Sequence, residues 1–326
     1  MKVIMSNATT IHELIPRANI IKLGVRLGAE IRNLRLSDDL PDEGLRAVNK
    51  LMLERKVIFF RDQQPLNEAQ HQRFARRLGN LVPDHQIGIA KVMPASLKPD
   101  SGPSGGRADQ RQHAVIMVEG YPKMSLLGSV RSPPCSGDTV WADMAGAYQA
   151  LPLPLRMLAD QLWAVHSNDG DYAIKAHATQ AEKQELDAVF AGTSSETEYP
   201  VVLVHPETGE RMLSVGSVVQ RFVGLQNYTG QKLFGLFRSY ITAPENTVRW
   251  SWMPGDVAIW DSRATQYHEM KDHGDHHRLQ DHATTNCDVS LSIEARRRTK
   301  PVNRSKPQAP KAHEAYGDMR SRNSPR

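Results

Sequence analysis

A short apolar strand, held between a tight turn and a histidine-rich segment, sets the main limit on the architecture of this chain. Residues 257–260 form an apolar run, which predicts a buried strand, and Pro254 and Gly255 before it predict a turn. A polar loop is expected after this strand, and it carries five histidines: His268, His273, His276, His277 and His282. Because histidine is the commonest metal ligand, the loop is a candidate metal site. Its spacing matches no zinc finger or other closed metal motif, so the alternative is a solvated loop rich in histidine.

Short apolar runs of this kind recur along the chain and are separated by helical patterns. The runs that predict strands are residues 57–60, 114–118, 124–127, 139–141, 201–204, 212–215 and 248–252. Ser37 is expected to cap a helix that runs to Arg55, and further helices are predicted at residues 67–78, 144–150, 152–162 and 229–240. Residues 166–200 are polar and fit neither pattern. The strands and helices do not alternate as they do around a parallel sheet, so we predict a mainly β (α+β) fold of antiparallel strands with peripheral helices.

The composition fits one large β-rich domain. The chain has 326 residues, of which 40% are apolar. No run of about 18 apolar residues exists, so no membrane span is expected. The first residues lack the apolar core of a secretory signal. The two cysteines, Cys135 and Cys287, form no C-x-x-C pair, which is typical of a reducing compartment. We therefore predict a cytoplasmic protein.

Charge and proline content divide the chain into three parts. Residues 295–326 hold ten Lys/Arg and two Asp/Glu, a net charge of +8, so the remainder carries −3 of the overall +5. This segment is rich in proline and poor in large apolar residues, and we expect a disordered basic tail. It has no interleaved aromatic residues for base stacking, so no specific nucleic-acid binding is expected. Residues 1–19 are expected to be a lead-in and residues 20–294 the folded domain, in which residues 83–110 form a lid loop or a disordered segment.

Five strings of the sequence, taken in order, resemble one family. They are Val-Ile-Phe-Phe-Arg-Asp-Gln at residues 57–63, Gly-Asp-Thr-Val-Trp-Ala at 137–142, Val-His-Ser-Asn-Asp at 165–169, Thr-Val-Arg-Trp at 247–250 and Pro-Gly-Asp-Val-Ala-Ile-Trp-Asp-Ser-Arg-Ala-Thr-Gln at 254–266. Together they resemble the TauD/TfdA (taurine dioxygenase-like) family, and the resemblance covers roughly residues 20–290. It implies a double-stranded β-helix, a jelly-roll barrel that is decorated with helices.

The resemblance also implies a chemistry. Enzymes of this family bind Fe(II) through a His-x-Asp pair and a distal histidine, and they chelate 2-oxoglutarate at the iron. An arginine and a threonine hold the far carboxylate of 2-oxoglutarate, and dioxygen is used to hydroxylate a small acidic substrate, often a sulfonate, an alkyl sulfate or an aryloxyacid. Three protein ligands on one face of the iron leave positions open for the co-substrate and dioxygen. A small acidic molecule is therefore the expected partner.

This chain differs from the family pattern at the positions of the iron ligands. Gln112 and Ala114 stand where the family has the histidine and the aspartate, and Tyr267 stands where it has the distal histidine. A glutamine amide oxygen is a weak neutral ligand, and alanine has no donor atom. His113 and His268 each lie one residue after a family histidine position, and on a strand one residue reverses the face of the side chain.

The anion-binding positions are kept in part. Thr139 and Arg278 match the family pattern, whereas His282 stands at the position of the 2-oxoglutarate arginine. An arginine offers a rigid and always charged fork to a carboxylate, but a histidine offers one donor and is largely neutral at pH 7. Thr139, Arg278 and His282 are therefore the candidates for holding 2-oxoglutarate or another anion.

Three hypotheses follow for the pocket. In the first, which the ligand positions favour, Fe(II) and 2-oxoglutarate do not bind in the family's manner, and the protein is a pseudoenzyme, a small-anion binder or a metal-independent enzyme. In the second, it is an active Fe(II)/2-oxoglutarate-dependent dioxygenase with displaced ligands, such as His113 and His268 brought inward by bulges. In the third, Zn²⁺ or Cu²⁺ binds to the histidines of residues 268–282. The sequence identifies neither the substrate nor the oligomeric state, and a homo-oligomer is one of the alternatives.

A few other side chains have expected roles of a more general kind. His166 falls where the family gathers pocket side chains, with a hydrogen-bonded surface turn as the alternative. The tryptophans of residues 250–260 are expected to pack the barrel. Asp256 and Asp261 are expected to cap turns.

Overall fold

The computed structural model describes residues 15–64, 68–79, 121–131, 137–167, 196–216, 219–270, 279–288 and 291–292. The expected lid at residues 83–110 and tail at residues 295–326 lie outside these ranges, as do residues 1–14 of the expected lead-in. Within the described ranges, no helix has the length and apolar character that a membrane crossing needs.

The largest sheet has six strands in the order β1-β2-β3-β12-β4-β14. Their bounds are β1 (Ile20–Lys22), β2 (Ala29–Ile31), β3 (Val57–Phe60), β12 (Val257–Asp261), β4 (Tyr121–Arg131) and β14 (Leu279–Asp288). β2 and β3 run parallel, and every other neighbouring pair is antiparallel. The strands predicted at residues 57–60 and 257–260 are confirmed and pair with each other in the middle of this sheet.

A three-stranded sheet in the order β11-β5-β13 faces the large sheet. It consists of β11 (Thr247–Trp250), β5 (Thr139–Asp143) and β13 (Thr265–Glu269). Side chains from both sheets meet in one buried layer, which we call the aromatic layer: Leu27, Val57, Phe59, Leu127, Trp141, Val248, Trp250, Trp252, Ala258, Trp260 and Tyr267. Two mostly antiparallel sheets packed over a shared apolar layer form a jelly-roll barrel, which confirms the predicted fold class and the packing role of the tryptophans.

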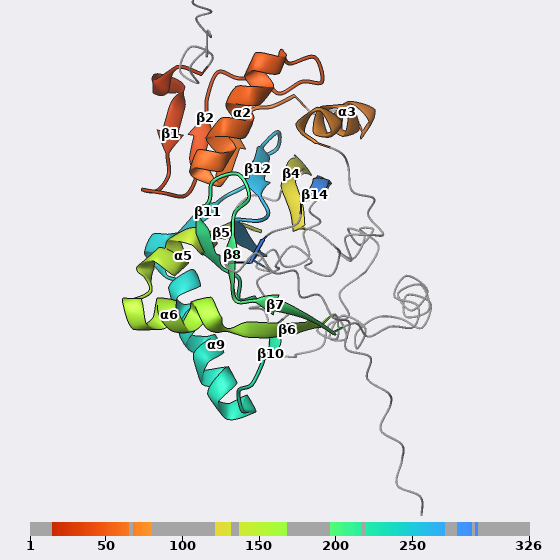
Figure 1. The fold of residues 1–326 in the computed structure, drawn as a ribbon. Helices are drawn as coiled ribbons and strands as arrows, with labels where there is room; N and C mark the ends of the chain where they lie inside the picture. The colour runs from red at the N-terminus through yellow and green to blue at the C-terminus, as the bar shows by residue number, and fades with distance from the viewer. Residues whose placement is uncertain are drawn as a thin grey trace, which may run out of the picture.

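Helices cover the outer faces of the two sheets (Figure 1). α2 (Asp42–Arg55) and α3 (Glu68–Leu78) pack on the large sheet, where Ile58, Phe60 and Ile259 point away from the aromatic layer and meet the apolar face of α2. α5 (Met144–Ala150), α6 (Leu153–Gln161) and α9 (Asn227–Ile241) form a second outer cluster. Because successive side chains of a strand alternate between faces, each sheet is buried on both sides.

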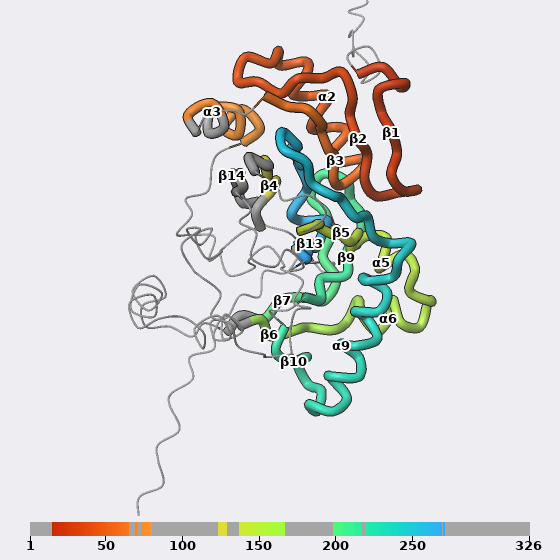
Figure 2. Tube along the Cα trace, turned by 180° about the vertical axis from the view of Figure 1, so that it is seen from behind, coloured from red at the N-terminus to blue at the C-terminus, as the bar shows by residue number. Residues whose placement is uncertain are grey.

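Two smaller sheets, β10-β6-β7 and β15-β8-β9, lie beside this barrel. Their strands are β6 (Trp163–Ser167), β7 (Glu196–Pro200), β8 (Val202–Val204), β9 (Arg211–Leu213), β10 (Val219–Phe222) and β15 (Leu291–Ser292), and short 3-10 helices occur at Arg17–Asn19 and Pro244–Asn246. The antiparallel pair β8 and β9 confirms the predicted hairpin. Figure 2 shows that β1, β2 and α2 lie at one end of the molecule and that α6, α9 and β10 lie at the other.

The first long helix begins later than the sequence predicts. α2 starts at Asp42 after Pro41, and no side chain hydrogen-bonds to its first turn as a cap. The Ser37 hydroxyl instead donates to the carboxylate of Asp39. Proline fixes its own φ and leads the chain into the helix without a serine cap, which is why the prediction placed the start too early.

Candidate functional site

Strand β13 carries two of the predicted site residues, Tyr267 and His268. The expectation of a polar loop is wrong here, because residues 265–269 form a strand along β5. The pairing runs without a register shift from Thr265 opposite Asp143 to Glu269 opposite Thr139. Gln266 is buried as well, and its amide Nε2 donates to the carbonyl oxygen of Val215 at 2.9 Å. The sequence of this segment is too polar to predict a strand, and tertiary contacts therefore hold it in the strand conformation.

Tyr267 points into the aromatic layer between the two facing sheets. It lies opposite Trp141 in the ladder, and its ring centroid is 5.3 Å from that of Trp260. Only 9% of the residue is exposed. A phenol oxygen therefore stands at the family's distal-ligand position, and it is a weaker neutral donor for Fe(II) than an imidazole nitrogen.

His268 follows Tyr267 in β13 and lies on the opposite face of the sheet. It is half-buried and pairs with Val140. The bulge that would turn this imidazole toward the aromatic layer is absent, because the ladder between β5 and β13 is regular. The interpretation of His268 as a displaced inward ligand is therefore corrected by the register of β13.

Thr139 lies at the start of β5, two residues before Trp141 and on the same face. Its side chain is fully buried, and its Oγ1 accepts a hydrogen bond from the indole Nε1 of Trp252 at 2.9 Å. A threonine hydroxyl can accept and donate at the same time, so this bond leaves the hydroxyl hydrogen for a second partner. The role of Thr139 as a donor to 2-oxoglutarate or another anion stays a prediction.

The other predicted site residues are not described at the level of their side chains. Gln112, His113, Ala114 and Arg278 lie outside the described residues, as do His273, His276 and His277. His282 is a residue of β14, and its backbone pairs with Leu127 of β4. Their predicted roles stay predictions.

A buried charged cluster, which the sequence did not reveal, holds the turn between β12 and β13. The Asp261 carboxylate accepts hydrogen bonds from the backbone N and Nε of Arg263, both at 2.9 Å, and from its Nη2 at 2.8 Å. His205, in the hairpin after β8, lies 2.8 Å from the same carboxylate through Nε2. Asp261 caps the turn as predicted, but its partner His205 is 56 residues away and no local pattern links them.

The hydrogen bonds of His205 indicate its tautomer. Its Nδ1 accepts from the backbone amides of Glu207 and Thr208 at 3.2 and 3.0 Å, so Nε2 carries the hydrogen and donates to Asp261. Burial favours a higher pKa for Asp261, but the hydrogen bonds from His205 and Arg263 outweigh it and lower the pKa to about 2. Both ring nitrogens of His205 are committed, so this histidine holds the turn and is not placed to act as a general base.

Asp256 caps the turn that leads into β12, as the sequence predicts. Its Oδ2 accepts from the backbone N of Met253 at 2.8 Å and from the indole Nε1 of Trp250 at 3.1 Å, and it pairs with Arg61. Burial raises the pKa of Asp256 to about 6 despite these hydrogen bonds.

His166 is not in a surface turn. It belongs to β6, is fully buried, and its ring centroid lies 5.1 Å from that of Tyr199. The alternative of an exposed turn is therefore wrong, because pairing of β6 with both β7 and β10 draws this residue into the interior.

The described residues do not offer a ligand set for iron. Among them, no group of three or more His, Cys, Asp or Glu side chains could hold a metal ion. The one iron-ligand position of the family that falls within them carries the phenol of Tyr267 in place of an imidazole. In this part of the chain the residues therefore do not fit Fe(II) in the family's manner.

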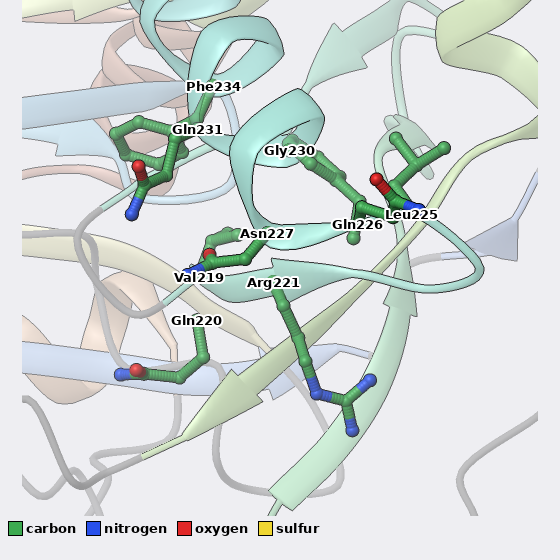
Figure 3. A pocket seen from close by; sticks show the side chains of 10 residues that line it. Val219, Gln220, Arg221, Leu225, Gln226, Asn227, Gly230, Gln231 and Phe234 are labelled. Carbon is green, nitrogen blue, oxygen red and sulfur yellow. The ribbon is translucent and has the colours of Figure 1, made fainter.

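A separate pocket lies between β10 and the first turns of α9 (Figure 3). It encloses about 510 Å³, which includes open solvent at its mouth. Its lining is Val219, Gln220, Arg221, Phe222, Leu225, Gln226, Asn227, Gly230, Gln231 and Phe234. None of the predicted site residues and no residue of the aromatic layer is among these lining residues.

Comparison with known proteins gives these positions a family context. The model of the taurine catabolism dioxygenase TauD, TfdA family matches residues 19–280. A relative from Pseudomonas putida, named alpha-ketoglutarate-dependent sulfate ester dioxygenase, is 42% identical over 294 residues, which are 89% of this chain and 97% of the relative. A relative from Acinetobacter baylyi, named alkylsulfatase, is 41% identical over 259 residues, which are 79% of this chain and 81% of the relative.

Solved structures agree with the sequence comparison. The crystal structure of a taurine dioxygenase from Burkholderia xenovorans aligns with a TM-score of 0.67 and 29% identity, and the alignment covers 85% of this chain and 93% of that one. Three findings lead to one assignment: the order of the strands, the match of the family model over most of the chain and the similarity to the relative from Pseudomonas putida. This chain belongs to the taurine catabolism dioxygenase TauD/TfdA family.

Proposed function

We propose that this chain is an alpha-ketoglutarate-dependent dioxygenase that acts on sulfate esters. One observation carries the proposal: the sulfate ester dioxygenase from Pseudomonas putida is 42% identical and is matched over 97% of its length. The alkylsulfatase from Acinetobacter baylyi, at 41% identity, supports the same substrate class. A sulfate ester is also a small acidic molecule, the kind of partner that the family resemblance implies.

The cofactors of such an enzyme are Fe(II) and 2-oxoglutarate. Bound iron would supply the activation of dioxygen. Its ligand set in this chain would differ from the family's, because Tyr267 replaces the distal histidine and His268 lies on the other face of β13. His113, which lies outside the described residues, and the phenol oxygen of Tyr267 are the candidate ligands, since tyrosine oxygen does ligate iron in some proteins. The hydroxyl of Thr139 would donate to a carboxylate of 2-oxoglutarate.

The proposal is tested by the stoichiometry of the products. Full-length protein is loaded with Fe(II) without oxygen, and 2-oxoglutarate, a linear alkyl sulfate and then air are added. Hydroxylation of the carbon that bears the sulfate oxygen releases inorganic sulfate and an aldehyde, while each turnover converts one 2-oxoglutarate to succinate and carbon dioxide. We expect equal amounts of sulfate and succinate. If neither product exceeds the protein-free blank while the relative from Pseudomonas putida is active beside it, the proposal is wrong.

The hypothesis that the ligand positions favoured, metal-independent binding of a small anion in the barrel, is supported less well than the dioxygenase, because the family and the relative from Pseudomonas putida are dioxygenases. It is favoured by the position of Tyr267, whose buried ring packs on Trp260 where an iron ligand would otherwise stand. In this case the Thr139 hydroxyl would donate a hydrogen bond to the bound anion, and no reaction with dioxygen would take place.

Calorimetry separates the two candidates. Metal-free protein is titrated with 2-oxoglutarate and with an alkyl sulfate, and each titration is repeated after Fe(II) loading. An anion binder is expected to bind equally well with and without the metal, whereas a dioxygenase is expected to bind 2-oxoglutarate more tightly when iron is present. Absence of binding in all four titrations would rule out the second candidate.

A further inference from the structure

The aromatic layer contains an unbroken series of ring contacts that begins at Tyr267. The centroid separations are 5.3 Å from Tyr267 to Trp260, 5.6 Å from Trp260 to Trp141 and 6.3 Å from Trp141 to Trp252. A branch runs from Trp141 through Phe59, at 5.2 Å and then 4.2 Å, to Trp250. These are the separations of aromatic rings in direct contact.

The two ends of the series differ in their surroundings. Tyr267 lies inside the barrel, at the position of the distal iron ligand in the family pattern. At the other end, the Arg61 guanidinium carbon lies 3.8 Å above the ring of Trp250, and 28% of that arginine side chain is exposed. Met253, which follows Trp252 directly, is 59% exposed. The series therefore connects the barrel interior with the layer just beneath the surface.

The side chains in the series are those that lose an electron most readily. Tyrosine and tryptophan are oxidised by one-electron oxidants, whereas phenylalanine is not and can only bridge two neighbours. Oxidation makes the indole N–H of tryptophan far more acidic, so the oxidised ring is stabilised by a nearby proton acceptor. Trp250 has one, because its Nε1 donates to the Asp256 carboxylate at 3.1 Å. Burial raises the pKa of Asp256 to about 6, which increases the affinity of this carboxylate for a proton.

We propose that these rings form an electron relay that carries an oxidising equivalent from Tyr267 in the barrel to Trp250 and Trp252 near the surface. An oxygen-derived radical in the barrel takes the phenolic hydrogen atom of Tyr267 and is thereby reduced and protonated. The tyrosyl radical regains one electron, passed along Trp260 and Trp141, and one proton from water. The electron comes from Trp250, whose indole proton moves to Asp256. A soluble reductant of the thiol class later returns one electron to Trp250 as Asp256 returns the proton, and the proton that the thiol loses neutralises the hydroxide left by the water.

The relay protects the interior and does not depend on the proposed dioxygenase function. It requires only ring contacts and an oxidant, so it is expected to operate in metal-free protein. A negative result in the alkyl sulfate assay would therefore not contradict the relay, and a negative result for the relay would not contradict the dioxygenase function.

The test uses metal-free, full-length protein and a light-driven one-electron oxidant, a ruthenium polypyridyl complex with persulfate. Radicals are identified by electron paramagnetic resonance after freezing, and oxidised residues by peptide mass spectrometry. An oxidant in solution enters the series at Trp250 or Trp252, and the equivalent is expected to reach Tyr267. We expect oxidation of Tyr267, at 9% exposure, to be comparable with that of Tyr228, at 73% exposure.

Substitution of Trp141 separates electron transfer from packing. Trp141→Phe and Trp141→Tyr remove similar volume from the aromatic layer, but only tyrosine can carry the equivalent. We expect the tyrosyl signal of Tyr267 to fall several-fold in Trp141→Phe and to return in Trp141→Tyr. Trp163→Phe is the matched control, because Trp163 lies in β6 outside the aromatic layer, and it is expected to behave as the unsubstituted protein. Circular dichroism shows whether each variant is folded.

Two outcomes would overturn the relay. One is an equal yield of oxidised Tyr267 in Trp141→Phe and Trp141→Tyr. The other is oxidation that follows exposure alone, so that Tyr228 and Met253 are modified and Tyr267 is not. If Trp141→Phe fails to fold, Trp260→Phe and Trp260→Tyr form the replacement pair, because the ring of Trp260 lies next to that of Tyr267 in the series.

Discussion

Tyr267 is the residue at which this chain departs most clearly from its family within the described structure. The registration of the sequence strings predicted the substitution, and the regular ladder between β5 and β13 places it on the inner face. The same ladder could not be foreseen from residues 265–269, because Thr, Gln, Tyr, His and Glu have no apolar alternation. The sequence therefore identified the position but not the strand that presents it.

Replacing Tyr267 by histidine is expected to increase metal affinity. An added imidazole at the distal-ligand position should lower the Kd for Fe(II) by about tenfold or more, which corresponds to ~1.4 kcal/mol. Titration under anaerobic conditions measures the change, with Tyr267→Phe as the control. If phenol oxygen is itself a ligand, the phenylalanine variant binds more weakly than the native chain. Equal affinity of all three proteins would contradict a role for this position in metal binding.

Thr139 tests the anion site in the same way. Thr139→Val removes the hydroxyl that would donate to a carboxylate and leaves the indole nitrogen of Trp252 without its acceptor. We expect weaker binding of 2-oxoglutarate by roughly tenfold and a loss of ~1–2 kcal/mol in stability. Thr139→Ser keeps the hydroxyl and should retain most of the affinity. Calorimetry and urea unfolding measure the two effects, and a valine variant with unchanged 2-oxoglutarate affinity would exclude Thr139 from the site.

At the level of elements, local sequence patterns predicted those strands and helices whose formation depends on their own residues. The strands β3 and β12, the helix α9 and the β8–β9 hairpin follow from apolar spacing and turn residues, and the structure contains them. Strands β6, β7 and β10 were missed because their pairing partners, and not their own composition, bury them. The Asp261–His205 contact was missed for a similar reason, since the two residues lie far apart in the sequence.

The turn into β12 depends on a glycine. Gly255 has φ of +82°, and a Cβ there would lie 2.8 Å from the carbonyl oxygen of Gln63. Gly255→Ala is therefore expected to destabilise the fold by about 2 kcal/mol or more through backbone strain and a backbone clash. Gly209 also has positive φ, +70°, but a Cβ there would have nothing within 4 Å, so Gly209→Ala should cost only about 1 kcal/mol. Chemical denaturation of both variants measures the difference, and equal losses would contradict the clash.

For the molecule as a whole, two buried carboxylates are expected to give stability opposite dependences on pH. The pKa of Asp261 is lowered to about 2, so its contribution is full above the unfolded pKa of 3.8 and is lost as the pH falls through 2. The pKa of Asp256 is raised to about 6, so its contribution is full below 3.8 and is lost as the pH rises through 6. The combined contribution of these two groups to the stability of the fold should therefore have a maximum near pH 4 and fall on both sides of it.

Urea unfolding at a series of pH values checks this dependence. Asp256→Asn is expected to flatten the decline between pH 4 and pH 7, because the amide does not titrate. Asp261→Asn should flatten the acid side and also lower stability at pH 7 by about 3 kcal/mol, since it leaves the fully buried Arg263 with less compensation. Parallel profiles for the native chain and both variants would show that other groups control the pH dependence.

The turn that carries the chain from β12 to β13 is fastened to a distant hairpin by Asp261, Arg263 and His205. Glu207, one-third exposed in that hairpin, binds both Arg263 and Lys123. A substitution at Glu207 is therefore expected to shift the strand that presents Tyr267 without changing any side chain of the aromatic layer. The interior could therefore be adjusted by substitutions on the outside of the protein.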